Sequence, residues 1–223
     1  MQTFLPPKGT RDCYPGDMII RDHIFNSWEK TCKRYGFEKY EGPIFEHLEL
    51  YMQKSGEEIE KQLYTLVDKS GRQLALRPEM TPSLARMVAA KGSSLKLPVR
   101  WYSIPRLFRY EKMQKGRTRE FFQLNMDILG ISQPTADAEL MALSIDTMRD
   151  LGLTSQDFSI RISSRTLLED LFLLSGVDAE KLPMLYSLLD KQHKMSGNDF
   201  DALLSECIPE KDIKATINKI LGI

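Results

Sequence analysis

Residues 121–129 read FFQLNMDIL, a run in which apolar and polar side chains alternate. Successive side chains of a β-strand point to opposite faces of its sheet, so this period of two predicts one strand with two unlike faces. The apolar face, which we expect to be buried, consists of Phe122, Leu124, Met126 and Ile128. The other face consists of Phe121, Gln123, Asn125 and Asp127. Because Asn and Asp are poor strand formers, this face favours a hydrogen-bonding floor for a small polar ligand, with an ordinary solvated strand face as the alternative.

A second predicted strand, 106–111, precedes this one and places Arg109 and Glu111 on one face. The connection between the two strands, Lys112–Glu120, reads KMQKGRTRE and is long, basic and glycine-containing. A hairpin does not need so many charges at its tip. Binding of a nucleotide polyphosphate does need them, because arginine pairs well with phosphate oxygens. A flexible surface loop is the alternative interpretation.

The surrounding segments predict a mostly antiparallel α+β core over residues 1–176. Apolar runs bounded by turn residues predict strands at 62–68 and 73–77, joined as a hairpin through Ser70-Gly71. Similar runs predict strands at 99–104 and 158–162. Helical spacing and capping residues predict helices that begin near Asp17, Thr81, Ala136 and residue 166. The first helix would bury one stripe, formed by Ile20, Ile24, Trp28, Cys32 and Tyr35. Residues 177–223 predict a small helical module, in which His193 is expected to be a surface helix residue.

Composition limits the possible functions. The chain has 223 residues, and its 31 basic and 31 acidic side chains balance, so any contact with nucleic acid must come from a local basic patch. The three cysteines lie far apart without a CxxC pair, and the three histidines lack ligand spacing, so neither a disulfide framework nor a metal site is expected. No apolar run approaches membrane-spanning length, and a cytoplasmic setting is expected.

The stretch FRYEKMQKGRTREFFQ (108–123) resembles motif 2 of class II aminoacyl-tRNA synthetases, with the loop pattern of the histidyl type. The resemblance implies that Arg109 holds the α-phosphate of ATP and the carbonyl group of the amino acid. It further implies that Glu111 lies at the adenine end, that Arg117 reaches the β- and γ-phosphates, and that Phe121 stacks on adenine. Arg109 and Glu111 would be the catalytic pair.

Three further segments resemble the same family. In LRPEMT (76–81), the resemblance implies that Glu79 and Thr81 bind the α-ammonium group of histidine, while Gln123 and Asp127 would bind the rest of that substrate. GFEKYEGPIFE (36–46) resembles motif 1, which implies that Pro43 lies at a homodimer interface. PPKGTRD (6–12) resembles the N-terminal signature, which implies that Arg11 and Asp12 lie near the acceptor arm of tRNA. Residues 158–223 resemble the strand after motif 2 and the helical insertion region.

The resemblance implies a class II synthetase fold and a histidine–tRNA ligase that uses ATP, Mg²⁺, histidine and tRNA-His. The sequence contains no motif 3, no Arg-Gly-Leu/Phe-x-Tyr-Tyr segment and no anticodon-binding domain, so we expect a part of such an enzyme that forms little histidyl-adenylate alone. One alternative is a synthetase-like regulatory subunit of ATP phosphoribosyltransferase that senses histidine without charging tRNA. Another is a plain binding or dimerisation module that uses motif 1.

Overall fold

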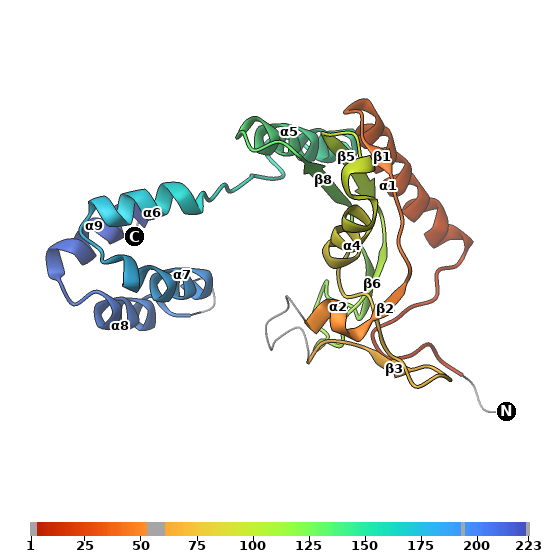
Figure 1. The fold of residues 1–223 in the computed structure, drawn as a ribbon, viewed down its shortest axis with the longest axis horizontal. Helices are drawn as coiled ribbons and strands as arrows, with labels where there is room; N and C mark the ends of the chain where they lie inside the picture. Colours follow the sequence, from red (N-terminus) through yellow and green to blue (C-terminus); the bar gives the residue numbers. More distant parts are fainter. Residues whose placement is uncertain (1–3, 53–60, 193–194, 222–223) are drawn as a thin grey trace. The chain divides into compact units, whose positions relative to one another are not determined.

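The computed structural model describes residues 4–52, 61–192 and 195–221, and His193 lies outside them. The chain forms two compact units that divide after Ser159 (Figure 1). This division comes earlier in the chain than the predicted one at residue 176. The reason is that Phe172, in helix α6 (Arg165–Leu174), is buried with Val177 in the apolar core of the second unit.

The first unit is organised around a three-stranded sheet. Its central strand β5 (Val99–Ser103) pairs antiparallel with β8 (Asn125–Leu129) and parallel with the short β1 (Glu38–Lys39). Helices α1 (Pro15–Arg34) and α5 (Thr135–Asp150) pack together against this sheet (Figure 1). Helix α4 (Thr81–Lys91) contributes Leu84 to a separate cluster with Tyr40 and Trp101.

The predicted alternation along 121–129 is confirmed for the residues of β8. Leu124, Met126 and Ile128 pack on a cluster with buried Tyr102 and Leu143. The single strand predicted there is wrong, because residues 123 and 124 interrupt it. The N-terminal piece is instead β7 (Glu120–Phe122), which pairs with β6 (Arg106–Phe108) in a sheet of its own. The strand predicted over 106–111 therefore ends at Phe108.

Helix α1 begins two residues before its predicted start. Pro15 is its first residue, and the Asp17 carboxylate accepts a hydrogen bond from the Tyr14 backbone amide at 3.0 Å. The predicted buried stripe is correct at Cys32, which is fully buried, and wrong at Ile20, which is 65% exposed. The sheet that buries the C-terminal part of α1 does not cover its first turns.

The predicted hairpin is confirmed as β3 (Thr65–Val67) paired antiparallel with β4 (Gln73–Leu76). The other edge of β4 pairs antiparallel with β2 (Phe45–His47), which runs directly into α2 (Leu48–Met52). A short 3-10 turn, Gly92–Ser94, follows α4. This second sheet leads straight into the LRPEMT segment.

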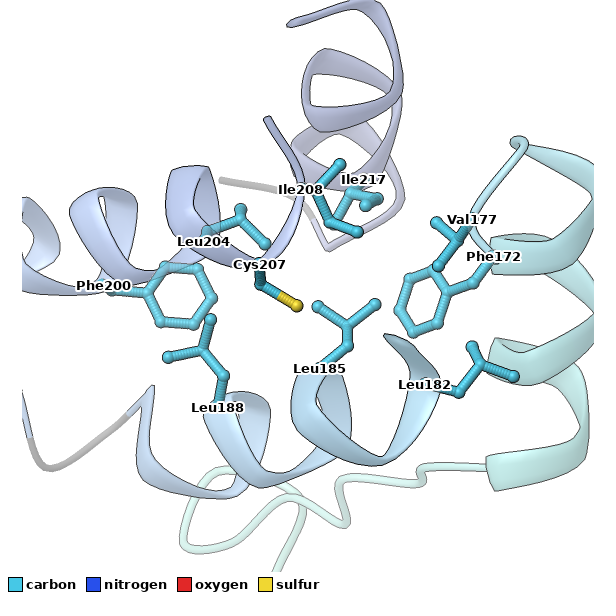
Figure 2. Close-up of a cluster of buried hydrophobic side chains, with 10 residues drawn as sticks. All are labelled: Phe172, Val177, Leu182, Leu185, Leu188, Phe200, Leu204, Cys207, Ile208 and Ile217. Atoms are coloured by element: carbon cyan, nitrogen blue, oxygen red, sulfur yellow. The ribbon is translucent and has the colours of Figure 1, made fainter. Parts of the chain in front are cut away.

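The second unit is helical, as predicted for residues 177–223. Besides α6 it contains the 3-10 turn Ala179–Lys181 and helices α7 (Leu182–Lys191), α8 (Gly197–Cys207) and α9 (Lys211–Leu221). Figure 2 shows its apolar core, where side chains from these helices converge around Leu185. The strand predicted at 158–162 does not form. Within the described ranges, no helix combines the length and apolar character that a membrane span requires.

Candidate active site

The strand register places Asp127 on the face of the sheet that looks away from α1 and α5. Asp127 lies opposite Trp101. Their strand neighbours Met126 and Tyr102 point into the cluster beneath α1 and α5. Asp127 and Trp101 therefore point to the other face of the sheet. Trp101 packs there against Tyr40, with 5.7 Å between the ring centroids.

Asp127 is a half-buried carboxyl group in a largely apolar setting. Burial raises its pKa, because the charged form loses contact with water. Burial also raises the pKa of Tyr40, and the Asp127 charge raises it further. A carboxylate held in this way is stabilised by a ligand that brings an N–H donor, such as an imidazole.

Arg109 is fixed next to the LRPEMT segment. Its Nε donates a hydrogen bond to the Pro78 carbonyl oxygen at 2.9 Å, and its guanidinium lies over the Phe121 ring, 5.3 Å from the centroid. The Phe108 amide also donates to the Arg77 carbonyl oxygen at 3.0 Å. These contacts bring the arginine of the motif 2 segment beside the segment that carries Glu79.

The loop 112–120 folds back on itself instead of extending as a free tip. Gln114 and Arg117 form a backbone bridge, and Gly116 has a positive φ of 81° in the turn between them. Glu111 lies between two guanidinium groups, 3.9 Å from Arg109 and 3.7 Å from Arg117. Ion pairs this long and exposed add little stability, so both arginines stay available for an anionic ligand.

Gln123 lies where β7 ends and β8 has not yet begun. Its backbone N–H donates to the Pro105 carbonyl oxygen at 3.4 Å, and the residue is exposed. Arg109 directly follows β6 of one small sheet, whereas Asp127 lies on β8 of another, and Gln123 lies between the two sheets along the chain. The roles that the resemblance implies for Arg109, Gln123 and Asp127 at the substrates stay predictions.

The N-terminal arm is bound to β7. The Gly9 carbonyl oxygen accepts hydrogen bonds from the amides of Arg119 at 2.8 Å and of Glu120 at 3.3 Å. This contact leaves the next residues of the arm, Arg11 and Asp12, exposed beside the motif 2 hairpin. Their predicted role at a tRNA acceptor arm stays a prediction.

Arg77 is a buried residue that the sequence did not single out. Its side chain is 2% exposed and donates to the carbonyl oxygens of Arg106 at 2.9 Å and Gly42 at 2.9 Å. It also pairs with Glu41, and Pro43 lies next to this contact. Arg77 thus connects the motif 1 segment to the motif 2 strand. Its place at the end of apolar β4 could have drawn attention to it, since a buried arginine needs several acceptors.

Among the residues that the structure describes, no group of three or more His, Cys, Asp or Glu side chains could hold a metal ion. A hollow at the start of β5 is lined by Leu97, Pro98 and Arg100, among others, and none of the predicted site residues lines it. Arg109, Arg117, Glu111 and Phe121 lie together on the motif 2 hairpin, and Asp127 lies separately on β8. The hairpin group suits phosphate groups and an aromatic ring, and the Asp127 carboxyl group suits an N–H donor.

Comparison with known proteins identifies the relatives of this chain. The family profile described as Histidyl-tRNA synthetase matches residues 9–220. A histidine–tRNA ligase from Opitutus terrae is 45% identical over 200 residues, which cover 90% of this chain and 46% of that protein. The chloroplastic/mitochondrial histidine–tRNA ligase of Arabidopsis thaliana is 43% identical over 190 residues, covering 85% of this chain and 39% of that protein. The chain thus spans about half the length of the curated relatives that it matches.

Solved structures show the same fold. Histidyl-tRNA synthetase from a Nostoc species matches 100% of this chain and 49% of its own, with a TM-score of 0.85 at 22% identity. A Bacillus halodurans protein described as an ATP phosphoribosyltransferase regulatory subunit/histidyl-tRNA synthetase matches 98% of this chain and 56% of its own, with a TM-score of 0.80 at 22% identity. The fold is therefore that of class II histidyl-tRNA synthetases. With a family profile that matches nearly the whole sequence and relatives of such high identity, the chain belongs to the histidyl-tRNA synthetase family.

Proposed function

We propose that this chain provides part of a site that joins histidine to ATP and then transfers the histidyl group to tRNA-His. In the first step, a carboxylate oxygen of histidine attacks the α-phosphorus of ATP. The bond to the bridging oxygen breaks, and pyrophosphate leaves with the electron pair. The observation that carries this proposal is the position of Arg109, held between the Pro78 carbonyl oxygen and the Phe121 ring.

The nucleotide would lie along the motif 2 hairpin. Arg109 would neutralise charge at the α-phosphate during the attack, which is where a fixed cation most lowers the barrier. Phe121 would stack on adenine, Glu111 would bind at its exocyclic end, and Arg117 would pair with the β- and γ-phosphates. Mg²⁺ would accompany the nucleotide and would neutralise charge on its phosphates.

Histidine would lie between the LRPEMT segment and β8. Glu79 and Thr81 offer a carboxylate and a hydroxyl group to the α-ammonium group, and Gln123 offers an amide. Asp127 would accept a hydrogen bond from the imidazole. The raised pKa of its buried carboxyl group supports this role, because an N–H donor compensates for the water that Asp127 has lost.

The remaining partners follow from the same family membership. Arg11 and Asp12 would contact the tRNA acceptor arm, Pro43 would lie at a homodimer interface, and the helical second unit would be the insertion module. The second candidate is a histidine-sensing regulatory subunit of ATP phosphoribosyltransferase. The contacts of Glu111 with Arg109 and Arg117 favour the ligase, since a sensor of histidine needs no phosphate-binding loop.

The test is histidine-dependent exchange of pyrophosphate into ATP, measured on the intact protein and on residues 1–223. We expect exchange with histidine and with no other standard amino acid in the intact protein, and little in residues 1–223, which lack the motif 3 arginine. Arg109→Ala should lower kcat/KM by at least about 100-fold. A matched control, Arg100→Ala, removes an arginine that pairs with Glu139 away from the site. Binding of histidine without exchange, together with capture of a phosphoribosyltransferase subunit, would establish the sensor instead.

A further inference from the structure

Two buried polar groups next to Asp127 have no role in the proposed function. Ser103 on β5 lies directly opposite Asn125 on β8. Ser103 is fully buried, and neither its Oγ nor the Asn125 Nδ2 has a hydrogen-bond partner among the residues that the structure describes. Buried polar groups in folded proteins are nearly always hydrogen-bonded to protein, ordered water or a ligand, so this pair has hydrogen-bonding capacity left for such a partner.

The pair lies on the same face as Asp127. Asn125 and Asp127 are two residues apart on one strand, so their side chains point to the same side and their backbones are about 7 Å apart. The apolar side chains of Tyr102 and Met126 occupy the opposite face. Two hydrogen bonds of about 3 Å span most of such a distance, so one small polar group between Asn125 and Asp127 can bond to both.

We propose that Ser103 and Asn125 form a second polar contact for the side chain of the amino-acid substrate, beside Asp127. This inference rests on the proposed function. An ionised Asp127 only accepts hydrogen bonds, whereas the Asn125 Nδ2 only donates, and the Ser103 hydroxyl does either. A neutral imidazole carries one N–H donor and one nitrogen acceptor, and it satisfies both requirements. A phenyl ring satisfies neither, and a lysine ammonium group has no acceptor for Asn125.

The pair therefore determines specificity and does not take part in the chemical step. Ser103 and Asn125 lie on the strands that carry Trp101 and Asp127, whereas Arg109 belongs to the hairpin of the other sheet. Loss of either polar group is expected to weaken histidine binding and to leave the KM for ATP unchanged. A purely structural role would lower stability without separating the two KM values.

The experiment compares Ser103→Ala and Asn125→Leu in the intact protein by histidine-dependent pyrophosphate exchange. The KM for histidine should rise about tenfold in each variant, with the KM for ATP and kcat within twofold of their original values. Histidinol, which keeps the imidazole and the ammonium group, should lose affinity by the same factor in a competition assay. Asn125→Asp keeps the size of the side chain and replaces its donor with acceptors, so it should show the same loss of histidine binding if Asn125→Leu fails to fold.

Matched controls come from the same chain. Ser27 Oγ and Asn218 Oδ1 are also buried without a hydrogen-bond partner in the described part of the chain, and they lie on α1 and α9. Ser27→Ala and Asn218→Leu should leave the KM for histidine unchanged. Equal KM values for histidine in the test and control variants would overturn the inference while leaving the proposed function intact. No histidine-dependent exchange in the unmodified protein would overturn the proposed function, and this inference with it.

Discussion

The carbonyl oxygen of Gly9 accepts a hydrogen bond from the backbone amide of Arg119 at 2.8 Å. The contact joins the N-terminal arm to the strand that follows the basic loop. Gly9 has a φ of 89°, and a Cβ atom added there would lie 2.7 Å from the Arg119 Cγ. The Arg119 guanidinium lies in turn over the Tyr110 ring, 4.0 Å from its centroid. Arm and hairpin therefore form one structural unit.

Gly9→Ala is expected to detach the arm from the hairpin. The substitution combines an unfavourable φ with a clash, and we expect it to cost about 2 kcal/mol of stability and to raise the KM for ATP. Urea denaturation and exchange kinetics measure the two effects. Gly71→Ala is the matched control, because Gly71 has a φ of 80° with nothing within 4 Å of an added Cβ. If both variants changed the KM for ATP equally, the contact between Gly9 and Arg119 would have no role in ATP binding.

Arg77→Met is expected to destabilise the first unit by about 2–3 kcal/mol, because the carbonyl oxygens of Arg106 and Gly42 lose their buried donors. The measurement is the urea midpoint at constant m-value. Arg34→Met removes ion pairs to Asp146 and Asp150 at the surface, and it should lower stability much less than Arg77→Met does. Similar losses of stability in the two variants would mean that the buried hydrogen bonds of Arg77 do not stabilise the first unit.

Asp127→Asn is expected to raise the melting temperature at neutral pH and to weaken histidine binding. Burial raises the pKa of Asp127 above its unfolded value, so the folded state binds more protons between those two pKa values. The stability cost of the charge is therefore absent below the unfolded pKa and fully present above the folded one. Thermal scans of the variant and the unmodified protein should differ at pH 7 and converge in acid, below the unfolded pKa of Asp127.

Asp157→Asn is expected to change the melting temperature at neutral pH in the opposite direction to Asp127→Asn. The Thr154 backbone amide and then its hydroxyl group hydrogen-bond to Asp157 and lower its pKa. Its contribution to stability is present above the unfolded pKa and is lost as the pH falls through the folded one. This variant should melt lower at pH 7 and match the unmodified protein in acid. A lower melting temperature for Asp127→Asn at pH 7 would refute the desolvation argument.

Leu185→Ala is expected to destabilise the second unit by about 3 kcal/mol, because Leu185 is fully buried among the helices shown in Figure 2. Histidine binding should not change, since every predicted histidine contact lies in the first unit. Calorimetric unfolding and histidine titration test both points. Leu174→Ala is the control at a leucine that is 85% exposed, and it should have almost no effect.

Local patterns in the sequence predicted much of the fold. Period-two alternation found the buried side of β8 because one face meets the Tyr102 cluster. Turn residues found the hairpin of β3 and β4. The interruption after Phe122 was missed, because an alternating pattern does not show that the partner strand changes from β6 to β5. Helical spacing places Ile20 in the core, because spacing alone does not indicate where the covering sheet ends.

The candidate site was predictable only in part. The segments that carry Arg109 and Glu79 could be found from their resemblance to the family. The hydrogen bond from Arg109 to Pro78 depends on how two sheets meet, which no spacing reveals. Ser103 and Asn125 were similarly hidden, because Ser103 is an ordinary strand residue until the register places it opposite Asn125.

The interruption at residues 123 and 124 has a consequence for how such a site changes over time. An unbroken strand would give Phe121 and Asp127 a fixed twist and spacing, so a substitution at one end would shift the other. With a joint between β7 and β8, each end is anchored by its own partner strand. Under the proposed function, mutations that refine nucleotide affinity and mutations that alter amino-acid choice would accumulate separately, with little interference between them.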